Sequence, residues 1–266
     1  MAAVRLSCRH CGGAGFVHVV IEGREFVRRC VCRQPHDRPA SADPFDLACI
    51  PPRYHRCTLA SFAARTPTQS AAYSIAARYC ERFAQERGAT GLGLVFHGGP
   101  GTGKTHIAVA VLAELVATHR VRGRFWEFAA LLNEITRSYG AIARSGASGP
   151  LESAIAADVL VLDDLGTRKM TDWADDTLFD VLNQRYMMCR PTLITTPYED
   201  VDPETAREAD AMQRMEFLTE RIGARLRSRL REMCVFVPME TPAERKARKP
   251  PRKPSTLVGL RRLTEP

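Results

Sequence analysis

One stretch of the sequence decides the fold: Leu92-Gly93-Leu94-Val95-Phe96-His97-Gly98-Gly99-Pro100-Gly101-Thr102-Gly103-Lys104-Thr105. It begins as an apolar run and ends in G-x-x-x-x-G-K-[ST], the phosphate-binding P-loop pattern, with every fixed position matched. The residues after Thr105 are apolar at the spacing of a helix. Because a buried strand enters the loop and a helix leaves it, a plain glycine-rich turn is the weaker interpretation. The stretch predicts a site for a nucleoside triphosphate.

Each position of this loop has a chemical purpose. Glycines let successive backbone N–H groups face phosphate oxygens, and Lys104 neutralises the β- and γ-phosphate charges. Thr105 offers its hydroxyl to Mg²⁺, and the following helix directs its positive end at the anion. We therefore predict ATP and Mg²⁺ as cofactors. The predicted nucleotide-binding residues are Gly98, Gly99, Pro100, Gly101, Thr102, Gly103, Lys104, Thr105 and His106.

Composition points to a globular protein that works where ATP is found. The chain has 266 residues, is 45% hydrophobic and carries a formal net charge of +8. It lacks an apolar run of the roughly 20 residues that a membrane span needs, and its first residues do not resemble a signal peptide. We expect a cytoplasmic protein without a membrane partner. Basic residues crowd the end of the chain, which is compatible with a polyanionic partner or with a solubilising tail.

The N-terminal residues 1–34 read as a separate zinc-binding β module. Cys8-x-x-Cys11 and Cys30-x-Cys32 flank two strand-like runs, residues 15–21 and 24–28, joined at a hairpin-compatible turn. Four thiolates can close a tetrahedral structural zinc site, and the metal would supply much of the folding energy of so small a module. His10 or His18 could replace one cysteine. Unpaired, reduced thiols are the alternative.

The remainder of the chain alternates strands and helices. Residues 35–56 are proline-rich and predict a linker, residues 57–245 an ATPase domain, and residues 246–266 a basic, disordered tail. A helix is expected near residues 69–85. We predict an α/β fold, a mostly parallel five-stranded sheet with helices on both faces. The expected strands are 91–97, 123–128, 158–163, 190–196 and 233–238, and the helices between them are 105–118, 129–144, 172–188 and 204–231.

Two further strands end in polar residues. Val159-Leu160-Val161-Leu162 is apolar enough for a central strand, and Asp163 and Asp164 follow at the edge where ligands bind in such sheets. We assign Asp163 to Mg²⁺ and Asp164 to the attacking water, as general base or positioner. Asp164 is one methylene shorter than the usual glutamate, so slow hydrolysis is expected. An Asp-rich turn without function is the alternative.

The next strand and a later helix complete the predicted site. Thr196, near the end of the strand at residues 190–196, is the candidate that senses the γ-phosphate, although threonines also suit any strand. The segment from Arg221 to Arg231 is a helix in which Arg225 shares one face with both Arg221 and Arg229. Such a ridge could supply an arginine finger to a neighbouring subunit. A solvated basic face is the alternative.

Taken together, these segments resemble the helicase loaders of the AAA+ ATPases, the DnaC/DnaI group, and the similar IstB transposition-helper ATPases. The resemblance covers about residues 50–245. It is carried by Gly98–Thr105, Leu160–Gly166, Thr195-Thr196, Ser228-Arg229-Leu230 with the strand at Cys234–Val237, and Ile50-Pro51-Pro52-Arg53-Tyr54.

The resemblance implies roles for two arginines and includes two departures. Arg229 would be the finger that acts in trans, and Arg245 the cis arginine that senses nucleotide. Pro197 stands where the family usually has asparagine, and a glycine that commonly precedes the second arginine is missing near Thr241. Several loaders also resemble this chain in having a small zinc module ahead of the ATPase domain.

The leading functional hypothesis is an ATP-dependent loader of the replicative helicase for the initiation of DNA replication. It would bind helicase and single-stranded DNA, with Tyr139 as the first candidate for base stacking, and form homo-oligomers when ATP is present. One alternative is an IstB- or TnsC-like ATPase that regulates a transposase on duplex DNA. A weaker alternative is a small-molecule P-loop kinase. An adaptor whose zinc module does the binding is a fourth possibility.

Overall fold

The computed structural model describes residues 16–21, 24–29, 43–86, 91–138, 149–201, 210 and 217–241. The chain divides into two units, Met1–Ala42 and Asp43–Pro266. In the smaller unit, β1 (Phe16–Ile21) and β2 (Arg24–Arg29) pair antiparallel, with Phe16 opposite Arg29. This pairing confirms the predicted hairpin strands. Cys8, Cys11, Cys30 and Cys32 lie outside the described residues, so the zinc site stays a prediction.

The larger unit contains the predicted five-stranded parallel sheet, in the order β4-β5-β6-β3-β7. The strands are β3 (Gly93–His97), β4 (Gly123–Glu127), β5 (Val159–Asp163), β6 (Thr192–Thr196) and β7 (Cys234–Pro238). Every residue of β5 and of β6 is buried, as expected of central strands covered on both faces. The sheet therefore brings the ends of β3, β5 and β6 to one edge.

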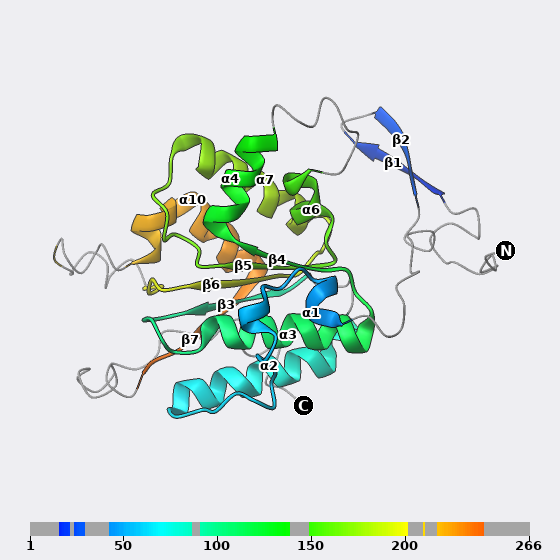
Figure 1. Cartoon of the computed structure of the whole chain (residues 1–266). Coiled ribbons are helices and arrows are strands. Elements are labelled where there is room, and N and C mark those ends of the chain that lie inside the picture. Colours follow the sequence, from blue (N-terminus) through cyan, green and yellow to red (C-terminus); the bar gives the residue numbers. More distant parts are fainter. Residues whose placement is uncertain are drawn as a thin grey trace. The chain divides into compact units, whose positions relative to one another are not determined.

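Helices cover both faces of this sheet (Figure 1). On one face lie α1 (Pro44–Leu47), α2 (Pro67–Glu86) and α3 (Lys104–His119). On the other lie α4 (Phe128–Ser138), α6 (Pro150–Ala156), α7 (Asp172–Met187) and α10 (Leu218–Met233). Within the described residues, no helix combines the length and the apolar character needed to cross a bilayer.

The segment that the proline content predicts as a linker packs into the larger unit from Asp43 onward. The carboxylate of Asp43 caps α1 by accepting from the N–H of Phe45 (2.9 Å), and a short 3₁₀ helix follows at Pro52–Tyr54. Phe45, Ala48 and Ile50 are buried in the core. The N–H of Phe125 donates to the carbonyl of Ala48 (2.8 Å), so this segment partly covers the exposed edge of β4. The apolar residues between the prolines thus make this segment part of the larger unit.

A fully buried arginine joins α7 to the start of β6, at the end of the sheet away from the P-loop. Arg185 is 0% exposed, and its guanidinium donates to the carbonyls of Ala154 and Ala157 (2.8 Å each) and to the hydroxyl of Thr192 (2.9 Å). Desolvation by burial lowers the pKa of Arg185 to about 9. The side chain thereby satisfies carbonyls at the end of α6 that would otherwise be buried without donors.

Replacement of this arginine should destabilise the fold. We expect Arg185→Met to lower the free energy of unfolding by about 3–5 kcal/mol, because it leaves several buried carbonyls without a donor. Arg137→Met is the matched control, since Arg137 is 75% exposed, and should change stability by no more than about 0.5 kcal/mol. Urea unfolding measures both, and equal losses would contradict the assigned role.

Candidate nucleotide-binding site

The P-loop connects β3 to α3 in a conformation that needs glycine at specific points. Gly98 has φ 129°, and a Cβ there would lie 2.1 Å from the carbonyl oxygen of Met239. Gly103 caps α3 with φ 91°, and a Cβ there would lie 2.7 Å from the ring of Phe62. Side chains at either position would therefore push the loop away from its neighbours. The glycines of the motif are required by sterics as well as by ligand approach.

The side chain of Lys104 lies across the loop. Its buried ammonium donates to the carbonyls of Gly98 (2.7 Å) and Gly99 (2.6 Å) and to the hydroxyl of Thr102 (3.2 Å). The amide of Gln69 donates to the carbonyl of Thr102 (3.1 Å), which links the loop to α2. The ammonium that the sequence pattern assigns to the phosphates is thus held by oxygen atoms of the loop itself.

Three elements meet at the carboxylate of Asp163, at the end of β5. Thr105, in the first turn of α3, donates its hydroxyl to Oδ1 of Asp163 (2.9 Å), and Thr195 of β6 donates to the same oxygen (2.6 Å). The hydroxyl of Thr195 also accepts from the backbone N–H of Asp164 (2.9 Å). Hydroxyl and carboxylate oxygens are the ligand types that Mg²⁺ prefers, so Thr105 and Asp163 fit the predicted cation.

Asp163 is electrostatically primed for a cation. Its pKa is raised to about 6, mainly by burial and also by the nearby carboxylates of Asp164 and Glu127, while the hydroxyls of Thr195 and Thr105 lower it. Glu127 ends β4 and pairs in register with Asp163. The sequence did not single out Glu127, because only the strand order shows that β4 and β5 are neighbours. A divalent cation would relieve this concentration of negative charge.

Thr196, the predicted sensor of the γ-phosphate, contacts the backbone just after β5. Its buried hydroxyl donates to the carbonyl of Leu165 (2.8 Å), whereas its neighbour Thr195 contacts Asp163. Successive residues of a strand point to opposite faces, so only one of the two threonines can reach the carboxylate. Thr195 is therefore the threonine of this strand that contacts Asp163, and the sensing role of Thr196 stays a prediction.

His106, the last residue of the predicted nucleotide-binding set, contacts the segment before α2. Its Nε2 lies 2.9 Å from the carbonyl oxygen of Thr58 and 3.2 Å from the hydroxyl of Ser61. Its ring meets that of Phe62 edge-on, with centroids 5.3 Å apart. His106 thus positions residues 58–62 beside the start of α3.

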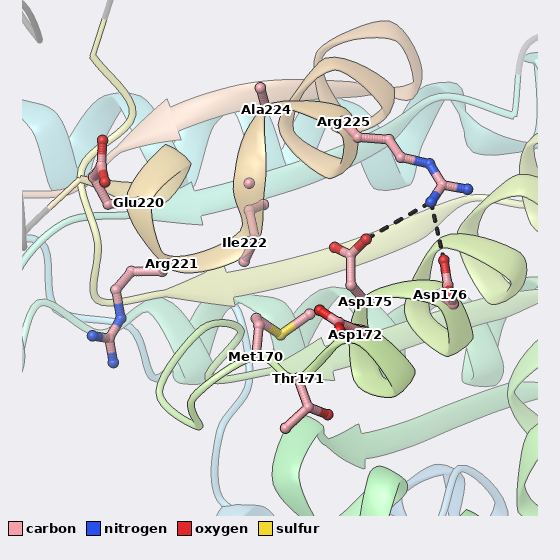
Figure 2. A pocket seen from close by; sticks show the side chains of 11 residues that line it. Met170, Thr171, Asp172, Asp175, Asp176, Glu220, Arg221, Ile222, Ala224 and Arg225 are labelled. Atoms are coloured by element: carbon pink, nitrogen blue, oxygen red, sulfur yellow. Dashed lines mark hydrogen bonds and ion pairs between the residues drawn. The ribbon is translucent and has the colours of Figure 1, made fainter.

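The arginine helix is broken in the middle. Gly223, with φ 76° and ψ 162°, interrupts α10, so Arg221 and Arg225 do not share the ridge that the sequence predicts. Arg221 donates to the carbonyl of Gly166 (3.1 Å), and Arg225 pairs with Asp176 (3.1 Å). In Figure 2 the two guanidinium groups point to opposite ends of a cavity of about 430 Å³ that the broken helix and the start of α7 line.

The second half of α10 keeps the predicted common face for Arg225 and Arg229. Both guanidinium groups lie over the ring of Phe179, at 3.6 and 5.8 Å from its centroid. Arg229 also stacks on Tyr186 (4.5 Å) and donates to Glu232 (2.7 Å), which leaves its side chain 21% exposed, against 54% for Arg225. Both arginines are thus held by aromatic and acidic neighbours, which a simply solvated basic face would not require. Arg245 and Tyr139 lie outside the described residues.

Comparison with known proteins finds relatives of this chain. A family model described as IstB-like ATP binding protein matches residues 82–202. Two proteins of Bacillus subtilis (strain 168), the uncharacterized protein YqaM and the phage-like element PBSX protein XkdC, are 26% identical over 130 residues and 31% identical over 104 residues. The matches cover 47% and 37% of this chain, and only 40% and 37% of those two proteins.

A helicase loader matches over a longer stretch. The replicative helicase loader DnaC of Escherichia coli (strain K12) is 24% identical over 189 residues, which cover 70% of this chain and 68% of that protein. The crystal structure of the DnaC helicase loader superposes with a TM-score of 0.59 at 27% identity, over 71% of this chain and 100% of that one. The chain therefore contains an IstB-like ATP-binding domain and is homologous to the helicase loader DnaC.

Proposed function

We propose that this protein is an ATP-dependent loader of the replicative helicase that also binds single-stranded DNA. The observation that carries the proposal is the meeting of Thr105, Asp163 and Thr195 beside the P-loop, in a chain homologous to DnaC. The site offers one cation for phosphate and a hydroxyl–carboxylate pair for Mg²⁺. ATP binding then acts as the switch for assembly with helicase, DNA and further copies of the chain.

Each residue of the site has a defined task in this proposal. Lys104 leaves the loop carbonyls to bind the β- and γ-phosphates, while the loop amides hold the remaining oxygens. Thr105 and Asp163 hold Mg²⁺, which when bound neutralises charge on the transferred phosphoryl group. Thr195 fixes the orientation of Asp163, and Asp164 orients the attacking water. The short side chain of Asp164 supports slow hydrolysis, in keeping with a switch.

The IstB-like match supports a second candidate, an ATPase that regulates a transposase on duplex DNA. The same nucleotide site would serve it, so the two candidates differ in partner and not in chemistry. The longer match to DnaC favours the helicase.

Zinc remains part of the proposal. Phe16 pairs with Arg29, so the chain enters and leaves the hairpin at the same end, with Cys8 and Cys11 before it and Cys30 and Cys32 after it. That order supports a shared site for four thiolates. Metal analysis of the full-length chain, with and without Cys8→Ser, tests it.

Lys104→Ala should abolish the switch. Loss of the buried cation removes charge-assisted contacts worth about 2–5 kcal/mol, so ATP affinity should fall by about 30-fold or more. The purified chain should co-elute with replicative helicase in ATP and not in ADP, and Lys104→Ala should not co-elute in either. Lys169→Ala, at an exposed lysine, is the matched control. Capture of a transposase without helicase would contradict the loader assignment.

Mg²⁺ binding should depend on pH through Asp163. Its pKa of about 6 means that protons compete with the cation, so the Mg²⁺-dependent gain in ATP affinity should fall by up to about tenfold per pH unit below about 6. Without Mg²⁺ the raised pKa acts on stability: the folded chain holds this proton more tightly than the unfolded chain, so stability falls as pH rises from about 4 to about 6. Calorimetric titrations at several pH values test the first effect, and an unchanged pH profile in Asp163→Asn would refute it.

Arg229 is proposed to complete the nucleotide site of the neighbouring copy. Arg229→Ala should keep ATP affinity within about twofold and lose most hydrolysis, because an arginine finger contributes about 10³-fold or more to the rate. A mixture with Lys104→Ala should recover activity, since each variant supplies the group that the other lacks. Arg225→Ala, on the same helix face and more exposed, is tested in parallel. Recovery that requires Arg225 in place of Arg229 would transfer the role to Arg225.

A further inference from the structure

A buried carboxylate connects the end of β6 to the arginine helix. The side chain of Asp200 is 0% exposed. It accepts from Nε of Arg227 (2.5 Å) and from the guanidinium of Arg231, both in the second half of α10. Arg227 also donates to the carbonyl of Val201 (2.7 Å). This clamp was not among the residues that the sequence singled out.

Asp200 lies close to the nucleotide site along the chain and in space. It follows Thr195 by a single short segment, and Thr195 donates to Asp163. Its backbone N–H faces Nδ1 of His97 (3.4 Å), the residue directly before the P-loop. The clamp is therefore attached both to the strand that touches the Mg²⁺ ligand and to the strand that carries the phosphate loop.

The two halves of α10 are attached to this segment at separate points. The N–H of Leu218 donates to the carbonyl of Glu199 (2.8 Å), and Tyr198 lies beneath Arg221 (4.6 Å), which fixes the first half. Asp200 holds the second half. Between them Gly223 has a backbone conformation that is essentially restricted to glycine, and a Cβ there would meet nothing within 4 Å. The second half can therefore take a direction of its own after Gly223: Leu226 and Leu230 pack it into the core, and the clamp attaches its polar side to the segment after β6.

The cost of an unpaired buried charge makes Asp200 and its two arginines move together. A carboxylate removed from water is costly unless it is paired and hydrogen-bonded, and Arg227 and Arg231 supply that pairing. A displacement of Asp200 must therefore carry these arginines with it or break the pair. Arg229 lies between them in the sequence, so it moves with the same half-helix.

We propose that Asp200 is a positioning residue that transmits the state of the nucleotide site to the second half of α10, and so sets where Arg229 stands for the neighbouring subunit. This inference rests on the proposed function, because it assumes an ATPase site shared between copies. Asp200 has no proposed contact with phosphate or metal. Its effect is exerted on the partner's site and not on its own.

Complementation between full-length variants separates the two kinds of effect. With Mg²⁺ and ATP, Asp200→Asn alone should lose about tenfold or more of the hydrolysis rate while its ATP affinity stays within about twofold of the original. Mixed with Lys104→Ala it should recover activity, because it supplies a sound site and receives a sound arginine. Mixed with Arg229→Ala it should not recover, because neither variant supplies a correctly placed arginine.

Other outcomes overturn the inference in distinguishable ways. If Asp200→Asn recovers with Arg229→Ala and not with Lys104→Ala, Asp200 supports its own site and the inference is wrong, while the shared site stands. If Lys104→Ala and Arg229→Ala fail to recover together, the shared site fails and the inference falls with it. Near-normal hydrolysis by Asp200→Asn alone also refutes the inference.

Two further variants guard against loss of folding. Arg231→Met removes only the more exposed partner, which is 46% exposed, and should show the same complementation pattern with a smaller defect. Asp158→Asn breaks another partly buried pair, with Arg122 (2.7 Å), at the opposite edge of the sheet. It should lower the thermal midpoint and leave hydrolysis near normal. A complementation defect in Asp158→Asn would mean that general destabilisation explains the Asp200 result.

Discussion

The arrangement of the P-loop edge depends on one interaction, the carboxylate of Asp163 held by two hydroxyl groups from different elements. Thr105 brings the start of α3 to it and Thr195 brings the end of β6, so the P-loop and two strands are fixed about a single oxygen. The parallel sheet makes this possible, because the ends of its strands lie at one edge. The pKa of Asp163 is raised to about 6, mainly by burial, so the fold disfavours the charged carboxylate and a bound cation would stabilise it.

The two ends of the parallel strands carry different kinds of contact. At the N-terminal ends, away from the P-loop, Arg185 and the pair of Arg122 with Asp158 satisfy buried carbonyls and carboxylates, and these contacts stabilise the fold. At the end of the sheet that carries the P-loop lie the charged residues Lys104, Asp163 and Asp164, for which the fold itself shows no stabilising purpose. Stabilising contacts therefore lie at one end of the strands, and the proposed nucleotide site lies at the other.

Sequence reasoning succeeded where local pattern determines structure. The P-loop, the strand that ends at Asp163 and the alternation of strands and helices follow from glycine spacing and apolar runs, and the structure confirms them. Local pattern does not show which of Thr195 and Thr196 contacts Asp163, because the two residues are chemically identical and only the pairing of β6 with β5 and β3 decides it. The sequence predicts a continuous helix across Gly223 because apolar residues continue on both sides of it, and the break appears only in the structure. Glu127 and Asp200 depend on strand order and on tertiary pairing, which no local pattern carries.

The most direct test is a crystal structure of the chain with Mg²⁺ and a non-hydrolysable ATP analogue. We expect Lys104 to leave the carbonyls of Gly98 and Gly99 for the β- and γ-phosphates. We also expect Mg²⁺ to be held by Thr105 and Asp163, with Thr195 still donating to Asp163. A triphosphate bound away from Lys104, or a cation that avoids Thr105 and Asp163, would contradict these expectations.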